Sequence, residues 1–201
     1  MRTANREYRI FADMSISPDR AENTPAYEVR GRAVVFDTPT LLAEFDGIKY
    51  YEIIDRNAFA ACDMSDVIFN YNHGGKVVAR LRNKTLKLNI TNEGLDIVAD
   101  LSGTEEGRKL YEEIRGGYID KMSFAFIVDE DGGEEYDTEN HTRRVKKIRK
   151  LFDVSAVDIP AYNETTLSAR SSFSEEHKKE LKLLEQREQR RRRLIALTKI
   201  Q

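Results

Sequence analysis

The sequence predicts a mainly β protein with peripheral helices, built as a barrel or a sandwich. Short segments in which apolar and polar residues alternate recur along the chain, and turn-forming Asn, Gly and Asp residues separate them. One convincing amphipathic helix lies in the middle of the chain, and a charged helical stretch lies at its end. Because strands and helices do not alternate regularly, the pattern does not favour a parallel α/β sheet.

Composition favours one globular domain with charged additions. The chain has 201 residues, of which 40% are hydrophobic and 34% charged, and its net charge is −2. This length suits a single core, and the charge gives no general attraction to nucleic acid or to an anionic membrane. The single cysteine excludes an internal disulfide and fits a reducing compartment. No apolar run reaches the roughly 18 residues of a membrane span and the start lacks a signal-peptide core, so we expect a cytosolic soluble protein.

The first third of the chain predicts strands. Residues 7–16 alternate as a half-buried strand would, and a polar turn over residues 18–25 leads to a second strand over residues 26–36. Asp37, Thr38 and Pro39 end that strand, and a short strand is expected over residues 50–54. Asp55 can then cap a brief helix over residues 57–62.

The middle of the chain predicts a run of strands and then the helix. The strands are expected at residues 67–71, 77–82, 85–91 and 95–101. The helix begins after Thr104 and ends at Gly116, with acidic residues in its first turn. Its apolar stripe consists of Leu110, Tyr111 and Ile114. This helix leads directly into a strand over residues 118–128.

The last third combines a strand with a charged tail. Residues 129–142 predict a long polar hairpin loop, residues 145–157 a strand, and residues 159–163 the end of the compact part. From Ser174 the composition changes to Glu, Lys, Arg, Gln and Leu, which predicts an exposed helix that continues into the arginine run 190–193. Such a run is either a solvated, flexible end or a contact for an acidic partner or nucleic acid. We therefore expect a compact domain over residues 1–170 and a charged helical tail over residues 171–201.

Ser123 is the candidate nucleophile. In the strand over residues 118–128, Ser123 and Ala125 fall on one face, and bulky Met122, Phe124 and Phe126 fall on the other. A strand serine can simply bond to nearby backbone, and that interpretation stays open for the segment alone. Acyl transfer would need a base within about 3 Å of the hydroxyl and a third group that orients the base.

His73 and Asp153 are the candidates for these two positions. His73 follows a strand and precedes two glycines, so the backbone can bend its imidazole towards another strand, although a histidine in a turn can also be a plain surface residue. Asp153 lies within an apolar strand, where a carboxylate needs a partner, either the histidine or Arg149 and the backbone. Weaker substitutes for the third position are Asp158, Asp120 and His141. His141 and His177 are poor bases because neither is expected on a rigid element.

Other chemistries have less support. Lys121 lies on the same face of the strand as Ser123, so a Ser–Lys dyad is conceivable if that amine were buried. Cys62 reads as a small hydrophobic residue rather than a nucleophile. The three histidines and one cysteine show no metal-ligand spacing, and no nucleotide-binding, GxSxG or HExxH motif is present, so no cofactor is expected.

Five motifs in order resemble one protein family. They are residues 30–36 (Arg-Gly-Arg-Ala-Val-Val-Phe), 52–59 (Glu-Ile-Ile-Asp-Arg-Asn-Ala-Phe), 70–73 (Asn-Tyr-Asn-His) with Ala79-Arg80, 121–126 (Lys-Met-Ser-Phe-Ala-Phe), and 151–155 (Leu-Phe-Asp-Val-Ser) running on to 160–162 (Pro-Ala-Tyr). In this order, over about residues 28–168, the chain resembles the HK97-type prohead (capsid maturation) proteases of tailed bacteriophages, which are related to the herpesvirus assemblins.

The resemblance implies a serine endopeptidase with the herpesvirus-protease fold, a barrel of orthogonally packed strands ringed by helices. By motif, His73 is the base and Ser123 the nucleophile. The herpesviral relatives have a histidine where Asp153 falls, and an acid there gives a Ser–His–Asp arrangement. Family members often carry glycine at the position of Ala125.

The resemblance also implies partners and a location. Its substrates would be the scaffold segment of the major capsid protein or a separate scaffold, and the protease itself. Cleavage would take place inside the assembling procapsid in the host cytoplasm, with the portal protein and a second copy as further partners. The charged tail would serve in packaging or be self-cleaved. The main alternative is a non-catalytic capsid assembly or scaffolding protein on the same barrel, and a third interpretation is a cellular β-barrel peptidase or esterase.

Overall fold

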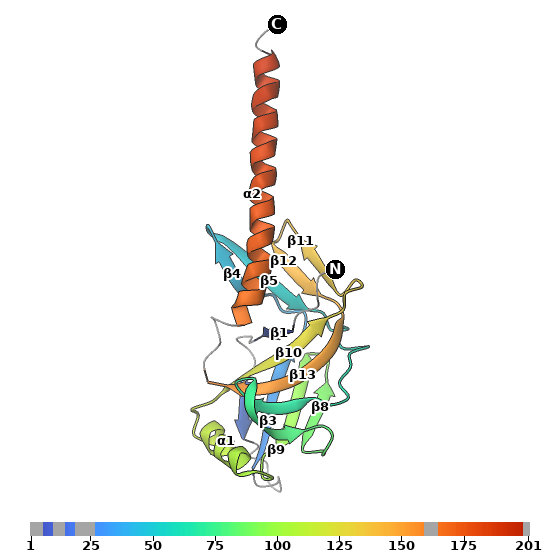
Figure 1. The fold of residues 1–201 in the computed structure, drawn as a ribbon, viewed down its shortest axis with the longest axis vertical. Helices are drawn as coiled ribbons and strands as arrows, with labels where there is room; N and C mark the ends of the chain where they lie inside the picture. Colours follow the sequence, from blue (N-terminus) through green and yellow to red (C-terminus); the bar gives the residue numbers. More distant parts are fainter. Residues whose placement is uncertain (1–5, 10–14, 19–26, 159–164, 199–201) are drawn as a thin grey trace.

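Strands dominate the structure. A computed structural model describes residues 6–9, 15–18, 27–158 and 165–198, and these residues form two sheets and two helices (Figure 1). The larger sheet contains β1 (Glu7–Arg9), β2 (Ser15–Pro18), β3 (Glu28–Val35), β6 (Ile68–Tyr71), β7 (Gly74–Arg80), β8 (Leu86–Ile90), β9 (Gly94–Asp100), β10 (Lys121–Val128) and β13 (Ile148–Val157). The smaller sheet contains β4 (Thr40–Phe45), β5 (Ile48–Ile54), β11 (Glu134–Asp137) and β12 (Thr142–Val145). The mainly β prediction with peripheral helices is confirmed.

The larger sheet is open, which corrects the expected barrel. Its order is β7-β6-β13-β10-β2-β3-β9-β8, with β1 added to β10. The edge strands β7 and β8 follow each other in the chain, joined by a turn in which Lys84 N donates to Leu81 O (2.9 Å). No ladder pairs these two strands in the described part of the chain. A barrel requires every strand to pair on both sides, so this sheet is not closed.

Most expected strands are present with ends shifted by a few residues. The strand expected over residues 7–16 corresponds to the separate strands β1 and β2, and residues 10–14 between them lie outside the described residues. The expected turn from Pro18 to Pro25 and the closing segment 159–163 also fall largely or wholly outside the described residues.

The smaller sheet holds the strands that the sequence prediction missed. β4 pairs with β5 through a tight turn at Asp46 and Gly47, both with positive φ (51° and 80°). An Asp-Gly pair between strands is a strong hairpin signal. The polar loop expected over residues 129–142 instead contains β11, which pairs with β12. Both strands are largely polar, so hydrophobic alternation did not indicate them.

The prediction of a helix over residues 57–62 is wrong. Three successive turns occupy this segment, with backbone bonds from Ala58 to Asp55, from Ala60 to Asn57 and from Cys62 to Phe59. The Asp55 carboxylate does accept a bond from Asn57 N (2.9 Å), as a cap would. So short a segment gains little from helix formation, and the turns still bury Ala58 and Phe59 in the core.

The expected central helix is confirmed as α1 (Glu105–Arg115). Thr104 caps it by accepting a bond from Gly107 N (2.9 Å), and Gly116 ends it by donating to Glu112 O (2.8 Å). Leu110 and Ile114 are buried against the sheet. The helix thereby anchors the chain one short turn before β10.

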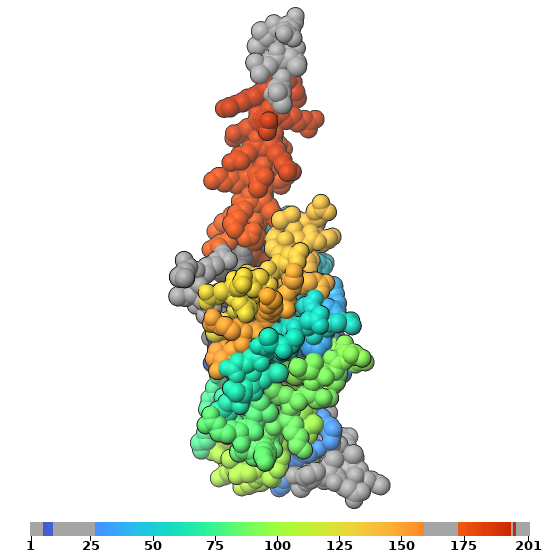
Figure 2. Space-filling model, turned by 90° about the vertical axis from the view of Figure 1, so that its right-hand side faces the viewer, coloured from blue at the N-terminus to red at the C-terminus, as the bar shows by residue number. Residues whose placement is uncertain are grey.

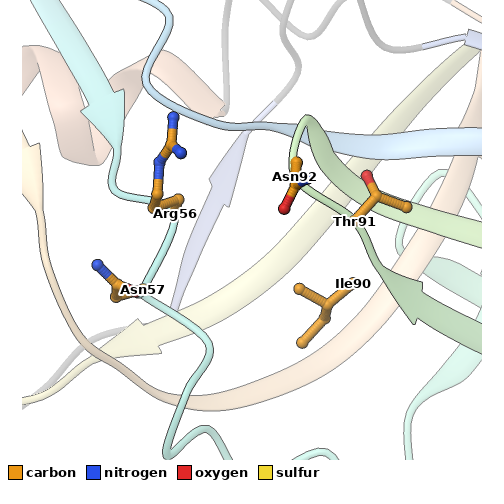
Figure 3. A pocket seen from close by; sticks show the side chains of 5 residues that line it. All are labelled: Arg56, Asn57, Ile90, Thr91 and Asn92. Carbon is orange, nitrogen blue, oxygen red and sulfur yellow. The ribbon is translucent and has the colours of Figure 1, made fainter.

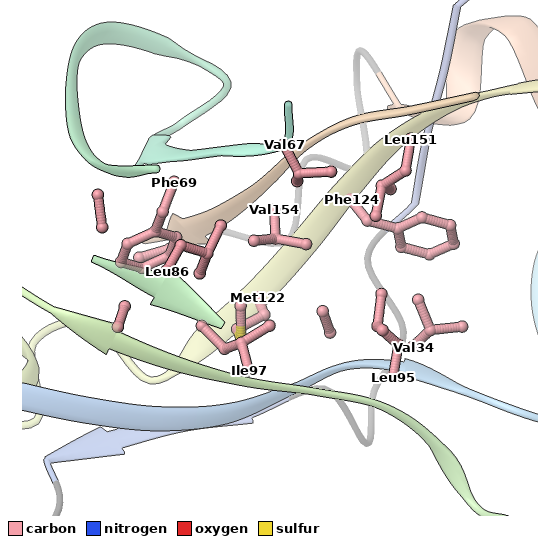
Figure 4. Close-up of a cluster of buried hydrophobic side chains, with 14 of the residues drawn as sticks. Val34, Val67, Phe69, Leu86, Leu95, Ile97, Met122, Phe124, Leu151 and Val154 are labelled. Carbon is pink, nitrogen blue, oxygen red and sulfur yellow. The ribbon is translucent and has the colours of Figure 1, made fainter. Parts of the chain in front are cut away.

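The main core covers one face of the larger sheet (Figure 4). Met122 and Phe124 of β10 point into it beside Val154 of β13 and Phe69 of β6, and all four are fully buried. Side chains alternate along a strand, so the residues between them face the opposite side. That opposite face of β10, β13 and β6 carries Ser123, Asp153 and Asn70.

The C-terminal helix α2 (Thr165–Thr198) packs at its base on the smaller sheet and then projects away from it (Figures 1 and 2). The helix expected from Ser174 is therefore confirmed but begins at Thr165, and the division of the chain at residue 170 remains a prediction. Phe173 is buried beside Tyr50, with ring centroids 5.5 Å apart. From Leu181 to Arg193 every side chain is exposed. Neither helix of the described residues is long and apolar enough to cross a membrane.

A buried ionic cluster joins the two sheets. Arg9 of β1 is 1% exposed and bonds to Glu52 of β5, which is fully buried. Arg143 of β12 bonds to Glu52 (2.6 Å) and to Glu7 (2.7 Å), and it also bonds to Glu134 of β11. Buried charges are tolerated only when they are paired in this way. The cluster therefore fixes the N-terminal strand between the sheets.

Candidate active site

Ser123 lies in the centre of the larger sheet. Its strand β10 pairs antiparallel with β13, and Ser123 stands opposite Ser155. β13 pairs in turn with β6, where Asn70 stands opposite Ser155. Ser123 is fully buried, and its hydroxyl is hydrogen-bonded to Nε2 of His73. The serine side chain thus bonds to another side chain, as a nucleophile requires, rather than only to backbone.

His73 occupies the tight turn between β6 and β7. Tyr71 pairs with Gly74, and both central residues of the turn, Asn72 and His73, have positive φ (50° and 55°). This is the conformation of a type I′ turn, in which the second central residue is usually glycine. Asn72 N donates to Ala156 O (3.0 Å), which ties the turn to β13. The turn therefore carries the imidazole over the sheet face that holds Ser123.

The two residues that precede His73 bond to Asp158. The Asn72 side-chain amide donates to Asp158 Oδ1 (3.2 Å), and the Tyr71 hydroxyl donates to Asp158 Oδ2 (2.5 Å). The hydrogen bond to Asp158 is the main cause that raises the pKa of Tyr71 to about 12, with burial adding to it. Asp158 therefore positions the histidine turn, and its contacts are not those of a third triad member.

Asp153 completes the chain of hydrogen bonds. It lies on β13 opposite the small residue Ala125, and its side chain is 2% exposed. Its Oδ1 lies 2.6 Å from Nδ1 of His73. A carboxylate can only accept, so the hydrogen sits on Nδ1 and leaves Nε2 able to accept from Ser123. Ser123, His73 and Asp153 therefore form one connected line, although 50 and 80 residues separate the bonded pairs in sequence.

Two further side chains bond to the Asp153 carboxylate, and the sequence interpretation named neither. Ser155 Oγ lies 2.9 Å from Asp153 Oδ1 and 3.2 Å from His73 Nδ1, and it also bonds to the Asn70 side chain. Arg6 Nη2 donates to the other oxygen, Oδ2, at 3.0 Å. Ser155 could have been found from its spacing of two residues from Asp153, which puts both on one strand face. Nothing in the sequence pairs Arg6 with a residue 147 positions away.

The remaining candidates of the sequence interpretation lie elsewhere. Lys121 forms its ion pair with Asp120 (3.6 Å), and no bond joins it to Ser123. His141 bonds to Glu180 of α2 through Nδ1 (3.3 Å). His177 is only 7% exposed rather than part of a free tail, because its ring bonds to Tyr50 (2.9 Å) and Asp46 (3.1 Å) at the base of α2. None of these groups is in the line of bonds that contains Ser123.

Cys62 is half-buried in the turn segment before β6. Burial raises the pKa of its thiol to about 12. The reactive thiolate is therefore scarce at neutral pH, which disfavours this residue as a nucleophile.

The surface carries a polar hollow of about 500 Å³ (Figure 3). The side chains of Arg56 and Asn57 line one side of it, and Ile90, Thr91 and Asn92 line the other. None of the three candidate catalytic residues lines it. Within the described residues, no group of three or more His, Cys, Asp or Glu side chains is arranged to hold a metal ion.

Comparison with known proteins gives the family. No curated protein and no solved structure matches the chain. A family model described as caudovirus prohead serine protease matches residues 14–180, which include Ser123, His73 and Asp153. That match spans most of the 201 residues, and the hydrogen-bonded serine, histidine and aspartate lie inside it. The chain therefore belongs to the caudovirus prohead serine protease family.

Proposed function

We propose that this chain is a capsid-maturation endopeptidase in which Ser123 is the nucleophile, His73 the general base and Asp153 the orienting acid. The observation that carries this proposal is the line of hydrogen bonds from Ser123 Oγ through both nitrogens of His73 to Asp153 Oδ1. It has the three parts that serine acyl transfer needs, in bonding contact and on rigid strands or a tight turn. Membership of a serine protease family supports the same roles.

The geometry supports the following course of reaction. His73 Nε2 takes the hydroxyl proton as Ser123 Oγ attacks the scissile carbonyl carbon, and Asp153 stabilises the imidazolium that forms. The tetrahedral intermediate collapses as His73 gives that proton to the leaving amine, which departs, and Ser123 remains acylated. Water then attacks the ester with its proton passing to His73. When this second intermediate collapses, His73 returns the proton to Ser123 Oγ and the acid product departs.

The proposed substrates are the scaffold segment of the major capsid protein, or a separate scaffold protein, and the protease itself. We place the cleavage inside the assembling procapsid in the host. Family membership carries this part of the proposal, because a prohead protease acts on the proteins that surround it in the shell.

Substitution of Ser123 with Ala tests the proposal. Co-expressed with the cognate capsid protein, the Ser123→Ala chain should leave shells assembled but uncleaved, with cleavage reduced by about 10⁴-fold or more because the acyl-enzyme cannot form. Mass spectrometry of the capsid protein and of the protease measures this. Ser102→Ala, at an exposed serine before α1, is the matched control and should cleave normally. Normal cleavage by Ser123→Ala would contradict the assignment.

A second role, as an assembly partner, has its own support. Beyond its base, α2 exposes Leu181 (42%), Leu183 (53%) and Leu184 (56%). The arginines at positions 190–193 are exposed near its end. A projecting helix with apolar and basic side chains is suited to contact with another protein. The same chain can therefore bind to capsid or scaffold subunits through α2 and act on them through Ser123.

A further inference from the structure

The N-terminal strand β1 reaches the candidate active site, although it lies outside the matched residues 14–180. It pairs antiparallel with β10 on the edge opposite β13, and Tyr8 stands across from Ala125. Arg6 and Tyr8 therefore lie on the same sheet face as Asp153. The Tyr8 ring meets the imidazole of His73 edge-on, with centroids 4.6 Å apart. One short segment thus touches both the acid and the base.

Arg6 has a defined place beside the acid. Its guanidinium donates to Asp153 Oδ2 at 3.0 Å and lies over the ring of Phe152, 4.1 Å from the centroid. Stacking on an aromatic face restrains a guanidinium and favours its charge. The Arg6 side chain is 38% exposed, whereas the carboxylate it binds is 2% exposed. Arginine thus brings a permanent charge to a carboxylate that water scarcely reaches.

The other partners of Asp153 do not replace Arg6. The Ser155 hydroxyl has one hydrogen, and it bonds to Asn70 as well as to Asp153. The nearby basic residues of β13 have different partners, since Arg149 bonds to Glu130 (3.4 Å) and Lys150 to Asp63 (2.9 Å). Among the described lysines and arginines, Arg6 is thus the one that bonds to Asp153.

The segment that carries Arg6 is firmly anchored. Three residues further along, Arg9 enters the buried ionic cluster with Glu52, and Glu7 bonds to Arg143. The pKa of Arg9 is raised because its acidic partners outweigh the effect of burial. Arg9 therefore stays charged and paired at every ordinary pH. The strand that it anchors holds Arg6 within reach of Asp153.

We propose that Arg6 is a positioning residue of the active site, supplied by the N-terminal strand. It holds Oδ2 of Asp153, so that Oδ1 stays aimed at Nδ1 of His73. The torsion that turns a carboxyl group is soft, and without Arg6 only the bonds of Oδ1 to Ser155 and to His73 itself would oppose its rotation. This inference rests on the proposed roles of His73 and Asp153 and extends the site to a segment that lies before the family match.

The labelling rate of Ser123 by a fluorophosphonate probe tests the inference. Arg6→Ala should react about 10- to 100-fold more slowly, the cost of a misaimed catalytic group, and Arg6→Lys should fall between Arg6→Ala and the unaltered chain. Arg149→Ala, at an exposed arginine of β13, is the matched control and should react at the unaltered rate. Melting temperatures are measured on the same samples. An unaltered rate for Arg6→Ala, or a slow rate that merely follows loss of folded protein, would overturn the proposal.

A second readout does not depend on activity. Nitrogen-15 NMR of the three histidines reports which ring nitrogen of His73 carries the hydrogen. The Nδ1–H signal of His73 should broaden or disappear in Arg6→Ala and persist in Arg149→Ala. If the unaltered chain is not labelled at all, the proposed protease function fails. The NMR signal then still decides the role of Arg6, and an unchanged signal in Arg6→Ala contradicts it.

Discussion

The backbone of His73 is strained. Its φ of 55° is in the left-handed region, which costs a residue with a Cβ atom about 1–2 kcal/mol. A glycine at this point of a type I′ turn would avoid that cost. A strained residue whose side chain bonds to both Ser123 and Asp153 is typical of a functional site. The strained turn lowers local stability, and this supports the proposed catalytic role of His73.

Substitution of His73 with Asn should separate activity from folding. Asn tolerates the left-handed region, so the turn should persist and the melting temperature should change by only a few degrees. Labelling of Ser123 by a fluorophosphonate should fall by about 10³-fold or more, because no base remains. Calorimetry and labelling kinetics on the same sample check both parts.

His141 provides the matched control for this substitution. It is also a histidine with positive φ (47°), but it bonds to Glu180 at the base of α2. His141→Asn should therefore keep the labelling rate of the unaltered chain. Equal rates in His73→Asn and His141→Asn would refute a catalytic role for His73.

The three candidate residues could be selected from the sequence because few of its side chains can act as the base or as the orienting acid. Their contacts were not part of that selection. Only three histidines are present, and an acid inside an apolar strand needs a partner. Arg6 was missed for a physical reason: its contact with Asp153 depends on the register between strands, which the alternation of single strands does not determine. Ser155 lies two residues from Asp153 on the same strand face, so its position could have been noticed in the sequence.

Among the elements, β1 is held by charge as well as by its ladder with β10. Burial opposes the ionisation of Glu7, but Arg9 and Arg143 outweigh it and lower the pKa of Glu7 from 4.5 to about 2. A carboxylate with a depressed pKa adds stability above its unfolded pKa, and this contribution is lost as the pH falls towards the folded value. For Glu7, the loss takes place between about pH 4.5 and pH 2.

The pH dependence of unfolding should therefore change in Glu7→Gln. We expect the free energy of unfolding at pH 7 to fall by about 3 kcal/mol, because each unit of pKa shift corresponds to about 1.4 kcal/mol. The difference from the unaltered chain should shrink as the pH falls from 4.5 to 2. Urea denaturation at several pH values measures it. A constant difference over this range would show that Glu7 does not titrate in the cluster. Glu44→Gln, at an exposed position of β4, is the control.

The elements that sequence reasoning missed share one feature, which is weak hydrophobic alternation. β11 reads Glu-Glu-Tyr-Asp and is mostly exposed, so only its pairing with β12 makes it a strand. The prediction for segment 57–62 failed in the opposite direction: its residues and cap suggested a helix, but the segment forms turns that bury Phe59. α1, with both a cap and an apolar stripe, was predicted well.

At the scale of the whole molecule, we propose different roles for the body and for the projecting helix. The candidate active site lies within the larger sheet, whereas α2 leaves the smaller sheet and extends into solvent (Figure 2). None of the side chains bonded to Ser123, His73 or Asp153 in the described residues comes from α2. Recruitment of the chain into a shell is the function that this helix can supply.

Replacement of the four arginines at 190–193 by serine should separate these roles. Labelling of Ser123 should be unchanged, while incorporation of the chain into procapsids should fall several-fold, because the basic end no longer attracts an acidic partner. Gel analysis of purified shells measures incorporation. A control chain loses four exposed charges on the body instead, by serine substitution of Arg82, Lys87, Lys109 and Arg115. Equal incorporation of the two variants would argue against recruitment through α2.

The wide spacing of the hydrogen-bonded residues has a consequence during biosynthesis. The bonds at His73 join residues 50 and 80 positions apart, and β13 is the last strand of the described chain to be made. Contacts between distant residues form late in folding, because long loops must close first. The nascent chain therefore lacks the complete line of hydrogen bonds among Ser123, His73 and Asp153 until β13 leaves the ribosome and inserts between β6 and β10. Topology alone therefore delays completion of the candidate active site until the last strand of the sheet has been translated.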